Sequence, residues 1–337
     1  MNKKTFPLFL SLLAGLVLFL GTVFKVGLIT IIKVFSELSI LAIFVLIVIS
    51  ALVCFINVYR WKILLEDEGA TVKWKSIIFA WLTGFSMSYL TPIVNLGGEP
   101  LRIYVLRCLT KVSWDKAVAS TVIDKAFDLT FNLFFVILGA GFFIFYSDVH
   151  LSLKIFVFVF ISILIFLTCL FYSRTLRKKN YLLPLVKFFG FSNNEKWVAG
   201  KETVQKTERI IHDFFDLKKS IFWQSFLLTF FRSLLHFARV ALIIFFLYNA
   251  FSFKNTLIIN SSIFLVGSLP IPGAFGSQEI SQAYLFSSLN GGAEVGVAFS
   301  LISRILDLIF VGLGLFVIFH FSFKNMLYKM TGWIKQR

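Results

Sequence analysis

Charged residues, cysteine and histidine are scarce in this sequence. Only 15% of the 337 residues are charged, and there are three cysteines and four histidines. The cysteines lie far apart, at Cys54, Cys108 and Cys169, so neither a disulfide framework nor a metal-ligand spacing is present. No G-x-x-x-x-G-K-[ST] or H-E-x-x-H motif occurs. We therefore expect no metal, no cofactor and no enzyme activity; these absences leave an intramembrane lipid-modifying enzyme as a minor alternative.

Apolar residues, by contrast, make up 58% of the chain, and the mean hydropathy is +0.87. Runs of about 20 apolar residues can cross the roughly 30 Å hydrocarbon core of a bilayer as helices. The first run resembles a signal peptide, but it is too long and lacks a cleavage site, so we interpret it as a retained helix. The sequence predicts an all-α polytopic membrane protein with about six transmembrane helices, at 6–29, 37–57, 117–146, 151–173, 221–249 and 296–321.

The formal net charge of +16 comes from 33 Lys and Arg against 17 Asp and Glu. In a membrane protein this excess indicates cytoplasmic loops rather than a nucleic-acid partner, because Lys and Arg collect on the cytoplasmic side. Arg60 and Lys62, for example, are expected to follow the second helix at that surface. All basic clusters fall on one side if both termini are cytoplasmic. We expect a multi-pass protein of the cytoplasmic (inner) cell membrane.

Two further apolar stretches are interrupted by proline and glycine. TPIVNLGGEP divides the stretch at 77–109, and SLPIPGAFGS divides the one at 256–289. Each stretch must return to the side that it left, or the charge pattern breaks. Irregular backbone survives at membrane depth only where protein or a water-filled cavity covers it. We predict two re-entrant helical hairpins, with hinge residues at Pro92, Gly97, Gly98, Pro270, Pro272, Gly273 and Gly276.

The two hairpins and the helices that follow them resemble each other. Glu99 corresponds to Glu279, and Lys125 and Asp128 lie 179 residues before Arg304 and Asp307. The predicted orientations are opposite, since the first hairpin enters from the cytoplasm and the second from outside. This pattern indicates an inverted-topology repeat, in which transporters place the substrate site near the midplane. We expect a single membrane domain at 1–337, with a first repeat at 37–146 and a second, inverted repeat at 221–321.

Residues 174–219 form the one sizeable polar segment, with eleven Lys and Arg against five Asp and Glu. Val204, Ile211 and Phe215 recur within it at helical spacing. We favour an ordinary cytoplasmic basic loop. The alternative is an amphipathic helix lying on anionic headgroups.

Two glutamates begin short helices directly after the helix breakers. Glu99 and Glu279 lie where a negative charge stabilises a helix N-terminus, which is a sufficient structural reason for both. Carboxylates inside a membrane are nevertheless costly and usually mark a pathway. Both residues are therefore candidate site residues.

The long helices after the hairpins carry paired charges. Lys125 with Asp128, and Arg304 with Asp307, have the i,i+3 spacing that places two side chains on one helix face. Each pair either neutralises itself, with the long cation reaching toward water, or contributes to a binding site. Asp124 adds a carboxylate one turn before Asp128.

The fifth predicted helix carries a positive stripe at i, i+4 and i+7, formed by Arg232, His236 and Arg239. Facing lipid, such a stripe would be very unfavourable, so it must face the interior of the bundle. Two interpretations remain open. The stripe pairs with Glu99, Asp128 or Asp307, or it captures a phosphate group.

Several of these features together resemble a known family. They are Gly98 and Glu99 followed by Arg102, the basic stretch to Lys116, Lys125-x-x-Asp128 and LPIPGAFGSQE at 269–279. The chain resembles, over about residues 8–321, the flippase-like membrane domain of lysylphosphatidylglycerol synthases and its stand-alone relatives. Family members commonly carry arginine where this chain has Lys125, so bidentate phosphate binding there is lost. The chain ends shortly after its last predicted helix, and we expect no synthase domain.

The resemblance implies a protein that moves lipids between leaflets, and some stand-alone relatives are associated with glycolipid or polyprenyl-linked sugar export. We therefore expect a lipid flippase for a phospholipid or glycolipid headgroup, with membrane lipids as partners. The alternatives are a secondary transporter of a small soluble solute and a non-catalytic membrane partner of a glycosyltransferase. A homo-oligomer and a cytoplasmic lipid-modifying or glycosyltransferase partner are further expectations.

Overall fold

In the computed structural model, the described residues are 38–91, 97–146, 150–180, 197–216, 218–248 and 252–334, with isolated positions between 24 and 36 and at 182 and 184. They form helices and turns, and no strand occurs among them. The helices are α3 (Ile40–Asp67), α4 (Trp74–Leu90), α5 (Glu99–Leu109), α6 (Trp114–Tyr146), α7 (Leu151–Leu176), α9 (Trp197–Phe214), α10 (Ser220–Tyr248), α11 (Phe253–Gly267), the short 3-10 helix η1 (Pro272–Ala274), α12 (Ser277–Ser288) and α13 (Ala293–Ile334).

Five of these helices, α3, α6, α7, α10 and α13, are long and apolar enough to cross a membrane. They coincide with five of the six predicted spans, which confirms the all-helical, multi-pass prediction for this part of the chain. The remaining predicted span, 6–29, lies outside the described residues. The second span was predicted to end at residue 57, but α3 continues to Asp67.

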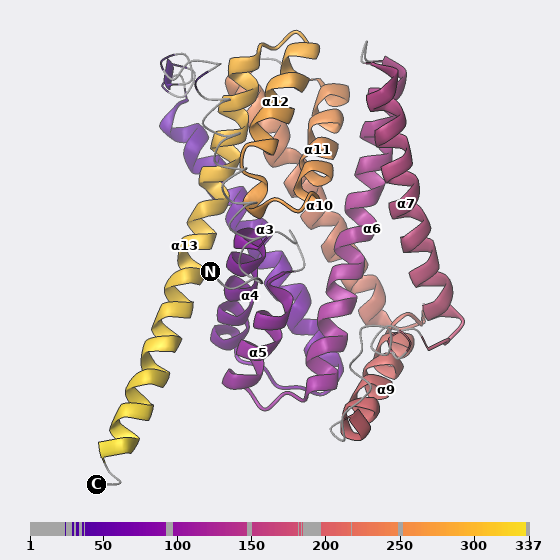
Figure 1. Cartoon of the computed structure of the whole chain (residues 1–337), viewed down its shortest axis with the longest axis vertical. Helices are drawn as coiled ribbons and strands as arrows, with labels where there is room; N and C mark the ends of the chain where they lie inside the picture. Colours follow the sequence, from indigo (N-terminus) through magenta and orange to yellow (C-terminus); the bar gives the residue numbers. More distant parts are fainter. Residues whose placement is uncertain are drawn as a thin grey trace, which may run out of the picture.

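The interrupted apolar stretches form pairs of short helices. α4 and α5 have 17 and 11 residues, and α11 and α12 have 15 and 12. At 1.5 Å per residue they are roughly 16 to 26 Å long, less than the thickness of a hydrocarbon core. α4 and α5 lie near one end of the molecule and α11 and α12 near the other (Figure 1).

Glycine enables the sharp turn between α11 and α12. Gly273 and Gly276 have φ angles of 56° and 75°, in the left-handed region that side chains disfavour. Gly97 and Gly98 form the turn that leads into α5, whereas Pro92 lies outside the described residues.

The long helix after each hairpin packs against the first helix of the other hairpin. On α11, Ser261 Oγ donates to the Phe135 carbonyl of α6 at 2.9 Å. On α4, Ser86 Oγ donates to the Val311 carbonyl of α13, also at 2.9 Å. Each hairpin is therefore bound to the long helix that follows the other hairpin, and the two contacts are equivalent.

Helix α10 contacts helices from both halves of the chain. Its Val240, Ile243 and Ile244 pack with Leu46 of α3 and Phe299 of α13 in one buried cluster. The helix also packs against α6 and α11, so it borders both long helices that follow the hairpins.

The basic segment at 174–219 contains helix α9. Its buried Ile211 and Phe214 pack with Phe127 of α6, and Tyr172 of α7 lies against the same cluster. Part of the segment predicted as a cytoplasmic basic loop is therefore helical, and its cytoplasmic location stays a prediction. The apolar face predicted to contact headgroups contacts protein instead.

The contact between α6 and α11 can be tested at Gly139. A Cβ atom there would lie 1.9 Å from Ser261 Oγ and 2.3 Å from the Leu257 carbonyl oxygen, whereas a Cβ at Gly141 meets nothing within 4 Å. We expect Gly139→Ala to lower stability by about 1–3 kcal/mol through overpacking. Gly141→Ala should be neutral or stabilising, because alanine favours helix. Thermal unfolding of both variants in detergent measures the difference, and equal midpoints would contradict the packing.

Candidate functional site

A cavity of about 310 Å³ lies between helices from both ends of the bundle. Its walls come from α3, α4, α6, α10, α11, η1, α12 and α13. The lining combines aromatic side chains, such as Trp81 and Phe85, with amide and charged groups. Eight residues predicted from the sequence line it: Asp124, Lys125, Asp128, Arg232, His236, Arg239, Arg304 and Asp307.

A smaller cavity of about 80 Å³ adjoins it and shares Trp81, Phe85, Tyr89 and Lys125 with it. The predicted residues Glu99 and Arg102 line this smaller cavity. Lys125 Nζ lies 2.7 Å from Glu99 Oε1, so an ion pair stands where the two cavities meet.

Arg60 organises the charges on the α6 side. Its side chain is fully buried, and its Nε and Nη2 donate to Asp124 Oδ1 and Asp128 Oδ1, each at 2.8 Å. Its Nη1 donates to Thr229 Oγ1 on α10 at 2.8 Å. One guanidinium thus joins α3, α6 and α10, using the planar fork that lysine lacks.

Arg102 brings α5 into the same network. Its Nη1 donates to Asp124 Oδ2 at 2.9 Å and to Glu99 Oε2 at 3.3 Å. Its guanidinium lies 3.7 Å from the centre of the Trp61 ring, in cation–π geometry. The buried cation is therefore held by two carboxylates and an aromatic face.

On the opposite side, Glu279 holds Arg304. Glu279 Oε1 accepts from Arg304 Nε and Nη2 at 2.9 and 2.7 Å, and its Oε2 accepts from the Gly276 N–H at 2.8 Å, which caps α12. Arg304 Nη1 donates to Tyr89 Oη at 2.9 Å and to the Gly273 carbonyl at 2.8 Å. Glu279 is fully buried behind Arg304, so the glutamate positions the arginine that lines the cavity.

The positive stripe of α10 reaches both long helices. Arg232 Nη2 lies 3.6 Å from Asp128 Oδ1, and Arg239 Nη1 lies 3.0 Å from Asp307 Oδ1. Seven residues separate the two arginines, about 10 Å along the helix. Pairing with Asp128 and Asp307, one of the two interpretations of this stripe, is therefore present, and pairing with Glu99 is not among the contacts of the described residues.

The other polar contacts of the stripe are with neutral groups. His236 Nδ1 lies 3.2 Å from Asn260 Oδ1, and Arg232 Nη2 donates to Asn132 Oδ1 at 3.4 Å. Among the described residues, Arg232 Nε and Arg239 Nε are buried without a hydrogen-bond acceptor. These two donors are the unused hydrogen-bonding capacity of the stripe.

The ion pairs of the long helices α6 and α13 connect them to other helices. Lys125 pairs with Glu99 rather than with Asp128, and Arg304 pairs with Glu279 rather than with Asp307. Self-neutralisation within one helix, one interpretation of the i,i+3 spacing, is therefore not what the structure contains. In both places a hairpin glutamate holds the helix cation, and an α10 arginine holds the helix aspartate.

The position predicted for Arg60 was wrong. It was expected at the cytoplasmic surface, yet it is buried among Asp124, Asp128 and Thr229. The signal was present in the polar residues that precede it, because Asn57 lies one turn earlier and lines the main cavity. That spacing indicates a polar stripe that continues beyond the predicted end of the helix.

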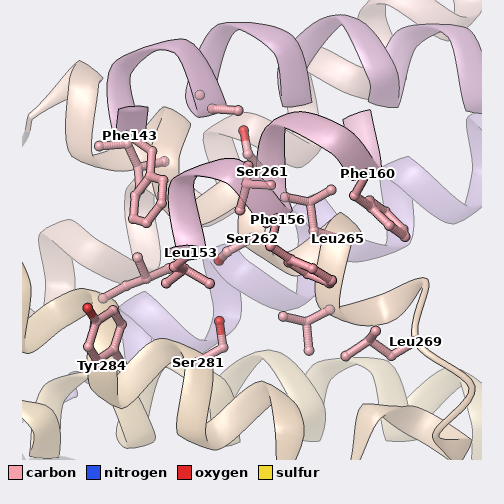
Figure 2. Close-up of a pocket in the computed structure, with 16 residues that line it drawn as sticks. Phe143, Leu153, Phe156, Phe160, Ser261, Ser262, Leu265, Leu269, Ser281 and Tyr284 are labelled. Atoms are coloured by element: carbon pink, nitrogen blue, oxygen red, sulfur yellow. The ribbon is translucent and has the colours of Figure 1, made fainter. Parts of the chain in front are cut away.

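A second, apolar pocket of about 170 Å³ lies between α6, α7, α11 and α12. Figure 2 shows Phe156 and Phe160 of α7 near Leu265 of α11, with Tyr284 of α12 at the lower left of the view. Neighbouring residues of α11 face the charged cavity, Asn260 among them. Helix α11 therefore separates a polar cavity from an apolar one.

Taken together, these features define a class: a multi-pass helical membrane protein with a charged internal cavity. Residues 8–314 match the lysylphosphatidylglycerol synthase TM region, and the chain belongs to this family. It is 24% identical to a UPF0104 membrane protein of Methanocaldococcus jannaschii, over 91% of both chains. It is 23% identical to a UPF0104 membrane protein of Methanothermobacter thermautotrophicus, over 74% of this chain and 75% of the other. No solved structure matches.

The two hairpin ion pairs should differ in their tolerance of substitution. Arg304 uses three nitrogens on four groups, whereas Lys125 makes one ion pair and is a quarter exposed. We expect Arg304→Lys to lower stability by about 2–4 kcal/mol, since lysine leaves buried acceptors unpaired. Lys125→Arg should change it by less than about 1 kcal/mol, because the charge is kept. Thermal unfolding in detergent compares them, and equal losses would contradict the assigned contacts.

Proposed function

We propose that this protein is a lipid flippase that moves a phospholipid or glycolipid headgroup between leaflets through the charged cavity. The observation that carries the proposal is the position of this cavity, whose charged walls lie on helices long and apolar enough to span a membrane. Ionisable groups within membrane helices are costly and mark substrate or ion pathways. A headgroup that crosses there loses its contacts with water and gains contacts with these polar groups.

The architecture that we propose is an inverted-topology repeat with both termini in the cytoplasm. The short helix pairs α4–α5 and α11–α12 are its re-entrant hairpins, and 37–146 and 221–321 are its repeats within one membrane domain. Two kinds of equivalent contact support the repeat. The ion pairs Glu99–Lys125 and Glu279–Arg304 correspond, and so do the hydrogen bonds of Ser86 and Ser261 to the opposite long helix.

In this account the site residues have separate roles. Arg232 and Arg239 attract the anionic part of the headgroup, and Asp128 and Asp307 hold these two arginines in position. His236 contributes a neutral hydrogen-bonding group between them. The remaining proposed site residues hold or shape the walls: Glu99, Arg102, Asp124, Lys125, Glu279 and Arg304.

The apolar pocket favours an amphiphile over a soluble solute. It lies beside α11, whose other face lines the charged cavity, so a lipid can place its headgroup and its chains in different surroundings. A secondary transporter of a small solute shares the charged cavity but has no use for the apolar pocket. A scaffold for a glycosyltransferase uses neither.

We also propose a cellular setting for the protein. We place the protein in the cytoplasmic membrane, with membrane lipids as its ligands and no catalytic role of its own. The basic segment containing α9 is the surface on which a cytoplasmic lipid-modifying or glycosyltransferase partner would act.

Leaflet exchange tests the function. Purified protein is reconstituted into phosphatidylcholine vesicles with trace fluorescent phospholipids or glycolipids, and dithionite bleaches the outer leaflet. We expect the protein to make the inner-leaflet probe bleachable, and Arg232→Gln together with Arg239→Gln to slow exchange at least tenfold, since each loses a charged hydrogen bond. Arg209→Gln, on the exposed surface of α9, is the control.

The proposal fails if wild-type vesicles bleach only the outer leaflet for every lipid class tested. It also fails in its site assignment if the double α10 variant folds and exchanges lipid as fast as the control. Uptake of a water-soluble solute into the same vesicles would then favour the secondary transporter.

A further inference from the structure

The charges around the cavity do not balance. The lining residues comprise four cations and three carboxylates, namely Lys125, Arg232, Arg239 and Arg304 against Asp124, Asp128 and Asp307, with His236 counted as neutral. Their buried ion-pair partners add two of each sign, namely Arg60 and Arg102 against Glu99 and Glu279. The lining alone has four cations and three carboxylates, and the lining with its partners has six and five, so the described cluster has one positive charge in excess by either count.

The excess is concentrated at Arg232. Its nearest carboxylate oxygen, Asp128 Oδ1, is 3.6 Å away and lies 2.8 Å from Arg60, which holds it more closely. Arg239 has Asp307 at 3.0 Å. The Arg232 side chain is about nine-tenths buried, and its Nε is one of the buried donors without an acceptor. Arg232 is therefore a buried cation that shares its carboxylate with Arg60 and has an N–H without an acceptor, and a bound anion would satisfy both needs.

Every carboxylate of the cluster, by contrast, is already engaged. Glu99, Asp124, Asp128, Glu279 and Asp307 each lie within 3.0 Å of an arginine or lysine nitrogen. A ligand ammonium group would have to displace one of these cations from its pair. Where the carboxylate is buried, as at Asp124 and Glu279, breaking the pair is strongly unfavourable, because it leaves a buried charge uncompensated.

The rest of the polar lining is neutral. Ser50, Asn57, Asn132, Asn260 and Gln278 line the cavity, and Asn57 Oδ1 is buried without a donor among the described residues. Neutral acceptors of this kind suit hydroxyl groups, which donate without bringing a charge.

We infer that the cavity selects a monoanionic, hydroxyl-bearing phosphodiester, held by Arg232, and discriminates against headgroups that carry an amine. This inference rests on the proposed lipid passage and names the class of headgroup that uses it. One phosphodiester charge brings the cluster to neutrality, whereas a zwitterionic headgroup leaves the excess in place and a cationic one doubles it. Hydroxyls of a glycerol or sugar then fill the neutral lining. Although the family is named after a lysylated lipid, the charges of this chain favour a phosphatidylglycerol headgroup without lysine.

Binding to the full-length protein in phosphatidylcholine nanodiscs tests the inference by calorimetry. The probes are dioctanoyl phosphatidylglycerol, phosphatidylethanolamine, phosphatidic acid and lysylphosphatidylglycerol, with glycerophosphoglycerol as the headgroup without chains. We expect phosphatidylglycerol to bind at least tenfold more tightly than the two amine-bearing lipids. Arg232→Gln should weaken it about tenfold to a hundredfold, the loss of a charged hydrogen bond, and abolish the preference. Arg209→Gln should change nothing.

A second variant tests the charge balance without removing the arginine. Asp307→Asn raises the excess from one charge to two, so phosphatidic acid should gain at least threefold relative to phosphatidylglycerol. Because Asp307 is about a third exposed, this variant keeps the test open if Arg232→Gln does not fold.

Equal or tighter binding of lysylphosphatidylglycerol or phosphatidylethanolamine would overturn the inference, as would an Arg232→Gln variant that folds and keeps its preference. If glycerophosphoglycerol binds as tightly as the dioctanoyl lipid and depends on Arg232, the charge selection stands, and the lipid passage of the proposed function fails. Binding of none of the probes overturns both.

Discussion

Pairing of charge inside a membrane is the constraint on which the rest of this structure depends. An uncompensated charge in hydrocarbon is costly, and each carboxylate of the cavity cluster has a cation within 3.0 Å that is supplied by a different helix. Arg60 is the clearest case, because it holds two aspartates of α6 and a threonine of α10. The ion pairs therefore do more than neutralise charge. They fix which helices are neighbours, and they leave the polar cavity where those helices meet.

Helix α10 connects the two long helices α6 and α13 through one stripe of side chains. Arg232 reaches Asp128 of α6 and Arg239 reaches Asp307 of α13, from positions two turns apart. The long helices in turn cross to the opposite hairpin, through Ser86 and Ser261. In the proposed function, this arrangement offers a headgroup two arginines along one helix, and Arg232, whose nearest carboxylate oxygen is 3.6 Å away, is the one with capacity for an anionic ligand.

Periodicity and composition predicted much of the fold. Five of the long helices and both short helix pairs were expected from apolar run length and from the glycine and proline breaks, and the α10 stripe was expected to face the interior. Partner choice was not predictable. The spacing of Lys125 and Asp128 suggests a pair within α6, but Glu99 competes for the lysine from α5. Arg60 looked like a surface cation because hydropathy falls after residue 57, whereas its burial depends on carboxylates 64 and 68 residues away. Helix α9 faces protein because α6 and α7 present aromatic rings to it.

The lipid content of protein extracted in native nanodiscs, read by mass spectrometry, tests most directly whether the charged cavity holds a lipid headgroup. We expect one headgroup class, anionic and free of amines, to be enriched over bulk membrane with the wild-type protein, and the enrichment to disappear when Arg232 is replaced by glutamine. Bulk lipid composition in both samples, or enrichment that persists in the variant, would contradict this expectation.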